Sequence, residues 1–261
     1  MDKLFVIKVG GNIIDDEQKL SSFLKDFSAI KEKKILVHGG GKLATNIAQQ
    51  LNIPQQLVDG RRITDAETLK VVTMVYAGFI NKNIVAQLQS SNCNAVGLCG
   101  ADGNLILAHK RIHPTIDYGF VGDIDSVNSK WLNKLLTENI TPVIAPVSHD
   151  NKGQLLNTNA DTIAQEIAKS ITGHYDVSSI YCFEKRGVLQ SAGDEDSVIS
   201  EITPLSYKEL KGKNIIHSGM IPKLDNAYAA LNSGVKKVII GKAEELEQVI
   251  SGSSGTSIIN E

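Results

Sequence analysis

Cysteine is scarce in this sequence, and its pattern argues against stabilisation by disulfides or by a zinc site. The three cysteines are Cys93, Cys99 and Cys182. The count is odd and no C-x-x-C pair occurs, which disfavours a disulfide framework and a zinc site. Cys93 and Cys99 lie in or beside an apolar run, so we expect them to pack in the core. A reducing compartment fits best, and we expect a cytoplasmic protein with no metal site of its own.

Long apolar runs and a charge surplus are also missing. The apolar stretch near the N-terminus covers only Leu4 to Ile7 before Lys8 interrupts it. That is too short for a signal peptide, and no later run approaches a membrane span. Lysine and arginine total 27 against 29 acidic residues, a net charge of −2. This balance favours neither a nucleic acid nor a membrane as partner.

The pattern that is present is an alternation of short apolar strands and amphipathic helices. Leu4 to Val9 predicts a strand, and residues 16–31 predict a helix with one buried face. A second strand at Lys34 to Val37 leads into a helix that ends near Leu51. This rhythm predicts an α/β protein with parallel strands and crossover helices.

The rest of the chain continues the pattern with more irregular connections. Thr64 and Glu67 have capping-box spacing and predict the start of a helix that runs to about Gln89 with a break near Gly78. A lobe boundary is expected near residue 173, giving lobes of residues 1–172 and 173–261. The other predicted elements are a hairpin over 56–63, a strand over 95–98, a polar hairpin region over 104–126, a helix over 130–138, a strand over 141–147, a helix from 157 to about 170, a strand over 177–183, helices near 206–211 and 220–233, and a strand over 236–240.

Two glycine clusters follow the first two predicted strands. They are Gly10-Gly11 and Gly39-Gly40-Gly41. Glycine lets the backbone approach an anion closely and point its N–H groups at phosphate oxygens, although tight turns alone would also explain the clusters. No Walker A motif occurs, because Gly241-Lys242 is followed by an alanine, and no G-x-G-x-x-G turn follows the first strand. Any phosphate site here therefore uses another architecture.

Several charged residues are candidates for chemistry, each with a structural alternative. Lys8 interrupts an apolar strand and could stabilise transferring phosphate oxygens, or reach solvent at a sheet edge. Lys223 is expected near a helix start, where a cation is favourable only beside a bound anion. Asp161 could be catalytic or a helix cap, and Arg62 could clamp a carboxylate or be a solvated hairpin charge. His38 has no evident catalytic partner in the sequence, and a structural role is favoured.

Together these residues resemble the amino acid kinase family over nearly the full chain. The matching segments, in order, are Ile7-Lys8-Val9-Gly10-Gly11, Val37-His38-Gly39-Gly40-Gly41, Asp59-Gly60-Arg61-Arg62-Ile63-Thr64, Asn81-Lys82, Ala95-Val96-Gly97-Leu98, Asp102-Gly103, Gln154 to Asp161, Gly219-Met220-Ile221-Pro222-Lys223, and Gly255-Thr256 with Ile258. The resemblance implies a three-layer αβα sandwich with an open, mainly parallel central sheet. It also implies that the first lobe holds the substrate and makes a homodimer contact, and that the second lobe holds ATP.

The resemblance assigns roles to the matching positions. Lys8 and Lys223 would stabilise the phosphoryl group, and Asp161 would orient both lysines. The positions implied to bind the substrate are Gly40, Gly41, Arg62 and Asn157, with Arg62 on its α-carboxylate. The positions implied to bind the nucleotide are Gly10, Gly11, Glu184, Gly187, Leu189 and His217.

The activity implied is transfer of the γ-phosphoryl group of ATP to the γ-carboxylate of an N-acylated L-glutamate, in arginine biosynthesis. Mg²⁺ would be held mainly by the nucleotide. Acetyl is the family's usual acyl group, and a larger one such as succinyl is open. Because the first strand starts almost at residue 1, feedback inhibition through an extra N-terminal helix is not expected.

One segment departs from the family pattern. Where members usually carry a hydroxyl and an aspartate along the ATP site, this chain has Phe183 and Glu184. Two alternatives to an acylated-glutamate kinase stay open, and this departure motivates only the second of them. One is a kinase acting on carbamate, aspartate, glutamate or UMP, and the other is a sensor that binds an amino-acid derivative without turnover.

Overall fold

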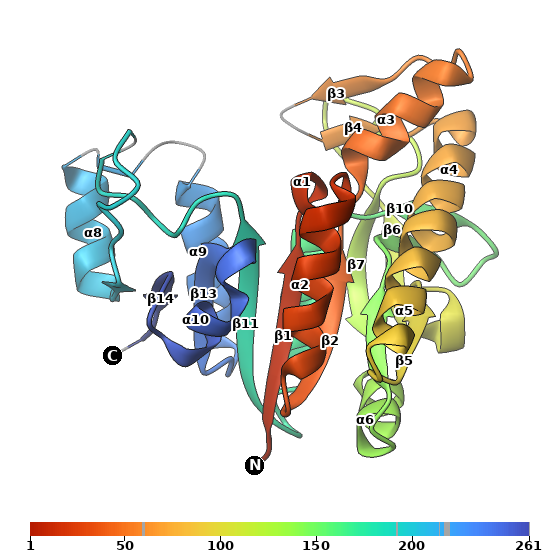
Figure 1. The fold of residues 1–261 in the computed structure, drawn as a ribbon. Helices are drawn as coiled ribbons and strands as arrows, with labels where there is room; N and C mark the ends of the chain where they lie inside the picture. The colour runs from red at the N-terminus through yellow and green to blue at the C-terminus, as the bar shows by residue number, and fades with distance from the viewer. Residues whose placement is uncertain (59–60, 192, 214, 217–219, 261) are drawn as a thin grey trace.

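A computed structural model describes residues 1–58, 61–191, 193–213, 215–216 and 220–260. Its centre is an eight-stranded sheet in the order β12-β14-β13-β11-β1-β2-β8-β5 (Figure 1). Neighbouring strands are parallel except for the pair β13 and β14. The strands are β1 (Lys3–Val9), β2 (Lys33–His38), β5 (Ala95–Leu98), β8 (Thr141–Ile144), β11 (Asp176–Phe183), β12 (Glu201–Ile202), β13 (Lys237–Lys242) and β14 (Thr256–Ile258).

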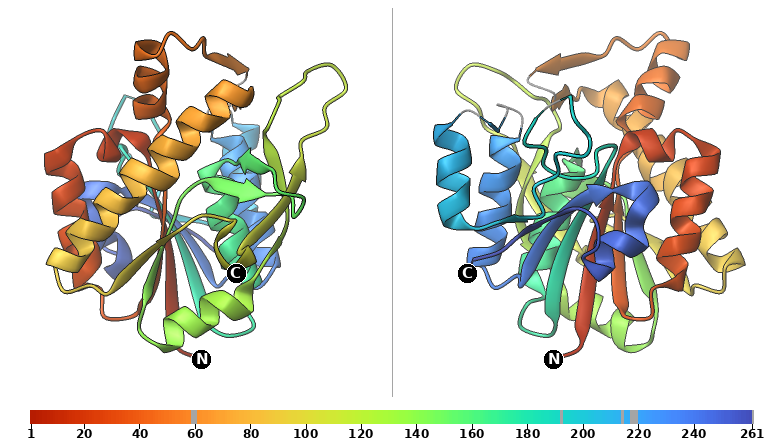
Figure 2. Two further views of the ribbon diagram at one scale, coloured as in Figure 1. Left: turned by 90° about the vertical axis from the view of Figure 1, so that its right-hand side faces the viewer. Right: turned by 60° about the vertical axis from the view of Figure 1, so that its left-hand side comes forward.

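Helices cover both faces of this sheet, which confirms the predicted three-layer αβα fold. In the left view of Figure 2, α2 and α5 lie on one side of the sheet and α7 and α9 on the other. The helices are α1 (Gly11–Ile14), α2 (Glu17–Ala29), α3 (Gly41–Gln50), α4 (Ala66–Val72), α5 (Asn81–Ser90), α6 (Ser129–Thr137), α7 (Ala160–Ser170), α8 (Pro204–Gly212), α9 (Ile221–Asn232) and α10 (Leu246–Ser251), with short 3₁₀ turns η2 (Asp102–Asn104) and η3 (Ala243–Glu245). None of the helices in the described ranges is long and apolar enough to cross a membrane.

The two faces of β1 belong to two separate hydrophobic clusters. Phe5, Ile7 and Val9 pack with α2, α5 and α10, whereas Leu4 and Val6 pack with α6, α7 and α9. Successive side chains of a strand point to opposite faces, so Lys8 points to the same face as Val6, toward α7. The alternating direction of side chains along β1 therefore places the Lys8 ammonium on the α7 side of the sheet.

The carboxyl ends of β1, β2 and β11 lie along one edge of the sheet, because these strands are parallel. Lys8 pairs in register with Tyr181 of β11 and with Val37 of β2. The segments that follow these strands, including Gly10-Gly11, Gly39 to Gly41 and Glu184, therefore meet at that edge. Ligands of open parallel sheets bind at such an edge.

Two smaller sheets are formed by strands between residues 56 and 157. A four-stranded sheet has the order β10-β9-β6-β7, and a two-stranded hairpin joins β3 to β4. Their strands are β3 (Gln56–Val58), β4 (Arg61–Ile63), β6 (Ile106–Lys110), β7 (Gly122–Val127), β9 (Val147–His149) and β10 (Leu155–Asn157). The antiparallel pairs β3–β4 and β6–β7 confirm both predicted hairpins. The single strand predicted over 141–147 is instead two strands, β8 and β9, in different sheets.

Two predictions about the long helical region were wrong. The cap of α4 is Asp65, whose carboxylate accepts a hydrogen bond from the Thr68 N–H at 2.7 Å, so the Thr64–Glu67 capping box does not form. Thr64 instead donates its hydroxyl to the Arg62 carbonyl. The helix does not break at Gly78 but passes through a π-helical segment, η1 (Thr73–Ile80), into α5. The lobe boundary near residue 173 stays a prediction.

Candidate active site

Two cavities lie at the carboxyl-end edge of the sheet and share Gly11. The first, of about 440 Å³, is called here the acceptor cavity; its walls are Gly11, Gly39, Gly40, Gly41, Lys42, Thr45, Leu57, Arg61, Arg62, Tyr76, Arg111, Val121, Pro146, Asn157, Thr158, Asn159 and Ala160. The second, of about 380 Å³, is called the donor cavity; its walls are Lys8, Gly10, Gly11, Asn12, Ile13, Cys182, Phe183, Glu184, Lys185, Gly187, Met220, Lys223 and Ile240.

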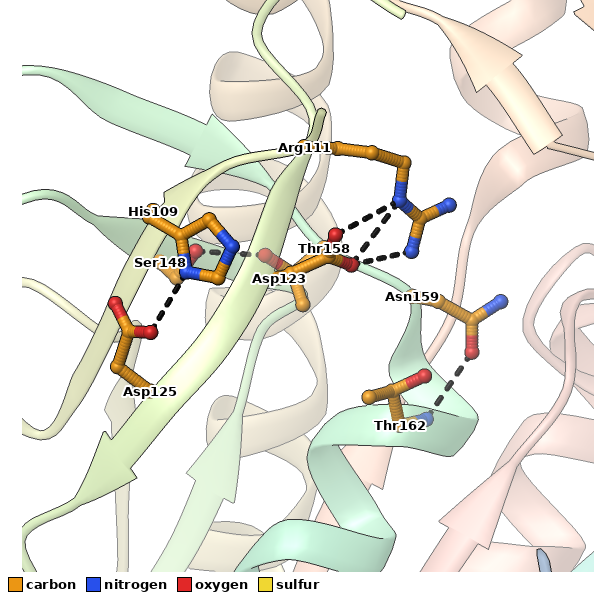
Figure 3. Close-up of polar contacts among 8 residues, drawn as sticks. All are labelled: His109, Arg111, Asp123, Asp125, Ser148, Thr158, Asn159 and Thr162. Carbon is orange, nitrogen blue, oxygen red and sulfur yellow. Dashed lines mark hydrogen bonds and ion pairs between the residues drawn. The ribbon is translucent and has the colours of Figure 1, made fainter. Parts of the chain in front are cut away.

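Lys8 and Asp161 form an ion pair beside both cavities. Lys8 Nζ lies 2.8 Å from Asp161 Oδ1, and the lysine side chain is 11% exposed. A buried ammonium is costly without such a counter-charge. Asp161 is placed by the first turn of α7, whose cap is Asn159, since the Asn159 Oδ1 accepts the N–H groups of Asp161 at 2.8 Å and of Thr162 at 3.1 Å (Figure 3). Asp161 is therefore not the cap residue, and its carboxylate is available to Lys8.

Lys223 projects from the first turn of α9 into the donor cavity. Its Nζ lies 3.8 Å from the centre of the Phe183 ring. Burial lowers the pKa of Lys223, the Asp161 carboxylate opposes that lowering, and the nearby Lys8 charge adds to it. Within the described ranges Asp161 makes an ion pair with Lys8 but none with Lys223, so its influence on Lys223 is through space.

The second glycine cluster has a backbone that only glycine adopts easily. Gly40 has φ of +148°, and a side chain there would overlap Ile80 Cδ1 from η1. Gly39 donates its N–H to the Val9 carbonyl at 3.1 Å, which ties this cluster to the end of β1. Helix α3 then begins at Gly41, so its N-terminus faces the acceptor cavity and favours negative charge there.

The predicted substrate residues Arg62 and Asn157 both line the acceptor cavity. The Arg62 guanidinium donates to the Gly41 carbonyl at 2.8 Å and to the Thr45 hydroxyl at 2.9 Å, and it also contacts Gln55 Oε1. Asn157 donates its amide to the Thr64 hydroxyl at 2.9 Å. Arg62 is thus held against the cavity wall by α3 and is not a freely solvated hairpin charge.

Sequence reasoning missed several residues of the acceptor cavity, notably Arg111 and Tyr76. Arg111 is held by Asp123, because its Nε donates to the two carboxylate oxygens at 3.0 and 3.1 Å (Figure 3). Tyr76 comes from η1, and burial raises its pKa. Arg111 lies in a hairpin and Tyr76 in a helix, so neither carries a local sequence signal. Thr158, also on the wall, is fixed by a 2.6 Å hydrogen bond to the buried Ser148 hydroxyl.

The acceptor cavity is strongly cationic. Lys42, Arg61, Arg62 and Arg111 line it, and no acidic side chain of the described residues does. Asp123 pairs with Arg111 from behind the wall. Such a lining attracts carboxylates and repels an ammonium group.

The predicted nucleotide residues divide into three groups. Gly10, Gly11, Glu184 and Gly187 line the donor cavity. Leu189 does not, because it bridges to Val198 in the loop that follows β11. His217 lies outside the described residues. Across those residues, no cluster of three or more His, Cys, Asp or Glu side chains with metal-binding geometry occurs.

His38 lies beneath the glycine cluster and is fully buried. Its Nδ1 donates to the Gly39 carbonyl at 2.8 Å, and its Nε2 accepts from the Asn81 amide at 3.1 Å. Burial lowers the pKa of His38 to about 4, so the ring is neutral. With both nitrogens occupied, the residue supports the loop, in agreement with the structural role favoured from the sequence.

The sequence profile described as the amino acid kinase family matches residues 3–242. The chain belongs to the amino acid kinase family. Among similar members, the acetylglutamate kinase of Cytophaga hutchinsonii is 58% identical, with 99% of each chain covered. The acetylglutamate kinase of Phocaeicola vulgatus is 54% identical, with 98% of each chain covered.

Solved structures with lower identity share the amino acid kinase fold. An N-acetylglutamate synthase from Neisseria gonorrhoeae, complexed with coenzyme A and N-acetyl-glutamate, superposes with a TM-score of 0.83 at 20% identity, covering all of this chain and 60% of that one. A carbamate kinase from Giardia lamblia bound to AMP-PNP gives a TM-score of 0.74 at 15% identity, covering 100% of this chain and 99% of that one. The segment that departs from the usual amino acid kinase pattern places Phe183 and Glu184 in the wall of the donor cavity.

Proposed function

We propose that the chain is an ATP-dependent kinase that phosphorylates the γ-carboxylate of an N-acylated L-glutamate, as a step of arginine biosynthesis. Acetyl is the acyl group in the names of the relatives above. One observation carries the proposal: the acceptor and donor cavities meet at Gly11, and the Lys8–Asp161 pair lies beside that meeting point. A carboxylate from one side and a triphosphate from the other would react there.

The acceptor cavity supports an acylated substrate over the free amino acid. Arg62 and Asn157 are proposed to hold the α-carboxylate, and Gly40 and Gly41 to present backbone N–H groups. Free glutamate carries an ammonium group that would face a lining of four cations. Acylation replaces that charge with a neutral amide. The lining therefore favours the acylated dianion.

The donor cavity supports a triphosphate. Gly10 and Gly11 are proposed to direct backbone N–H groups at phosphate oxygens, with Lys8 and Lys223 as fixed positive charges. Glu184 and Gly187 are proposed to contact the base and ribose, and Leu189 and His217 are assigned to the nucleotide by family position alone. Mg²⁺ is proposed to arrive with the nucleotide and to be held mainly by its phosphates. Lys8 and Lys223 would neutralise the charge that spreads over the phosphoryl oxygens, and Mg²⁺ bound to the nucleotide would add to this.

The proposed reaction is a direct in-line transfer. One oxygen of the γ-carboxylate forms a bond to the γ-phosphorus, the bond from that phosphorus to the bridging oxygen breaks, and ADP leaves. A carboxylate is already ionised near neutral pH, so no general base is needed. The chain contributes position and charge, and His38, with both its nitrogens occupied, takes no proton.

The proposals about oligomeric state and cellular location rest on the family resemblance. We propose a homodimer in the cytoplasm, with substrate in residues 1–172 and nucleotide mainly in residues 173–261. The acceptor-cavity walls fall between residues 11 and 160, which supports that division. The exposed side chains of Met74 and Phe79 on η1, 56% and 66% exposed, are available for a dimer contact. Light scattering on the purified chain tests the dimer.

A coupled ADP-release assay with MgATP tests the function. N-acetyl-L-glutamate, N-succinyl-L-glutamate and free glutamate are compared, and hydroxylamine traps any acyl phosphate. Turnover on an acylated glutamate, with little on free glutamate, is expected, and the better substrate identifies the acyl group. If none of the three substrates gives ADP release, the proposal is refuted, and another acceptor or a non-catalytic sensor is favoured.

A further inference from the structure

Phe183 ends β11 and lies between the donor cavity and a smaller cavity of about 40 Å³. The smaller cavity is also lined by Asp161, Tyr181 and Lys223. The Tyr181 and Phe183 rings stack with centroids 6.5 Å apart and planes inclined by 13°. Tyr181 pairs in register with Lys8, and alternation along β11 puts Phe183 on the same face of the sheet. The strand therefore presents an aromatic ring on the side where both lysines lie.

Two ammonium groups approach this ring. Lys223 Nζ lies 3.8 Å from the ring centre and Lys8 Nζ lies 5.4 Å from it. Both distances fall within the roughly 6 Å over which an aromatic face attracts a cation. The closer contact belongs to Lys223, whereas Lys8 has the Asp161 carboxylate as its partner.

We propose, building on the kinase function put forward above, that Phe183 is a positioning residue whose ring face holds the Lys223 ammonium at the phosphoryl-transfer point. A carboxylate partner would occupy N–H donors of Lys223 and compete with phosphate oxygens for them. An aromatic face attracts the charge and leaves the donors of the ammonium available. The ring also stabilises the charged form of Lys223, which burial disfavours. Phe183 thus prepares a cation for the nucleotide before the nucleotide binds.

The contact itself is tested by NMR of lysine methylene groups, with no need for activity. Protons next to Lys223 Nζ should be shifted upfield by the Phe183 ring current, and Lys223→Arg assigns the signal by removing it. Phe183→Leu should return the signal to the ordinary lysine position, whereas Phe183→Tyr should keep the shift. An ordinary position in the unmodified protein would overturn the proposal.

The positioning role is tested by fluorinating the Phe183 ring. Successive fluorine atoms weaken the negative ring face while changing its volume little. kcat should fall stepwise, by roughly tenfold across the series, which corresponds to about 1.4 kcal/mol. The KM for the acylated glutamate should stay unchanged, because Phe183 does not line the acceptor cavity. The same substitutions at Phe27, whose ring lies 5.2 Å from Lys34 Nζ and lines neither cavity, are the matched control.

A kcat that does not change along the fluorination series would overturn the positioning role, since a residue that only fills space would give that result. Failure of the kinase function is a separate outcome. An unmodified protein that phosphorylates no acylated glutamate refutes the proposed function, and the lysine NMR shift still decides whether Phe183 holds Lys223.

Discussion

Lys8 Nζ and Asp161 Oδ1 lie 2.8 Å apart, although more than half of the chain separates the two residues. The sheet makes this contact possible, because Lys8 points from β1 toward α7 and Asp161 stands in the first turn of that helix. The pair keeps a cation charged in a place where burial would otherwise disfavour it. It also fixes that cation beside the meeting point of the two cavities.

Asp161→Asn should lower kcat by roughly 10- to 100-fold, since Lys8 loses its orienting charge while the helix start keeps its Asn159 cap. Steady-state kinetics at saturating substrates measure the effect. Glu166→Gln is a matched control on the same helix. Glu166 Oε1 lies 2.8 Å from Lys169 Nζ, and neither residue lines the acceptor or the donor cavity. Equal kcat values for both variants would contradict a role of Asp161 in orienting Lys8.

Lys8→Ala and Lys223→Ala should each raise the barrier by about 2–4 kcal/mol, as loss of an oxyanion donor does. Single-turnover rates with MgATP check this without interference from product release. The exposed Lys236→Ala serves as a control. Full turnover by either of the two active-site variants would refute the assignment of that lysine.

Arg62→Lys should raise the KM for the acylated glutamate by roughly 10- to 100-fold and leave kcat less affected. Lysine keeps the charge but loses the planar fork that matches a carboxylate. It also loses the contacts to Gly41 and Thr45 that hold the side chain against the cavity wall. Kinetics with varied acyl-glutamate and saturating MgATP measure both constants. An unchanged KM would place the α-carboxylate elsewhere in the cavity.

Gly40→Ala should destabilise the protein by about 1–3 kcal/mol and weaken substrate binding, because any side chain there is strained by the backbone and overlaps Ile80. Urea unfolding measures the loss. Gly173→Ala is the control, since a methyl group there meets nothing within 4 Å, and it should stay within about 0.5 kcal/mol of the parent. A Gly40→Ala protein as stable as the parent would rule out the strain.

Stability should fall with acid because of His38. Burial lowers its pKa from 6.5 to about 4, so between these pH values the unfolded chain binds a proton that the folded chain does not. The free energy of unfolding therefore decreases as pH drops through this window, by about 3 kcal/mol in full. Urea unfolding across the window should show a shallower slope for His38→Gln than for the parent. Equal slopes would contradict the buried neutral ring.

Much of the fold was predictable because strand and helix periods were clear. The short apolar run of β1 predicted a strand, which is buried on both faces, and the spacing of Leu20, Phe23, Leu24 and Phe27 in α2 predicted one buried helical face. The glycine clusters and Lys8 were predictable because parallel strands bring their carboxyl ends to one edge. The start of α4 was not predictable, because Thr64 and Asp65 are both residue types that cap helices well. Asp65 is the cap, and the Thr64 hydroxyl instead accepts a hydrogen bond from Asn157.

The rest of the acceptor cavity depends on contacts that are distant in sequence. Arg111 reaches the cavity through the β6–β7 hairpin and is held by Asp123, which no local pattern reports. Tyr76 lines the cavity from η1, which is a π-helix. The α-helical period therefore does not predict which residues of this segment face the cavity. Leu189 was placed at the nucleotide site by family position alone, and it lies outside the donor-cavity wall.

In the proposed reaction, a substrate carboxylate oxygen attacks the γ-phosphorus. The most direct measurement uses acyl-glutamate with heavy-isotope oxygen in its γ-carboxylate, MgATP, and hydroxylamine to cleave the acyl phosphate at its carbonyl carbon. Mass spectrometry of the released phosphate should find one labelled oxygen in each molecule, carried over from the carboxylate. Phosphate without the label would show that ATP is cleaved by water instead, and would contradict direct transfer to the carboxylate.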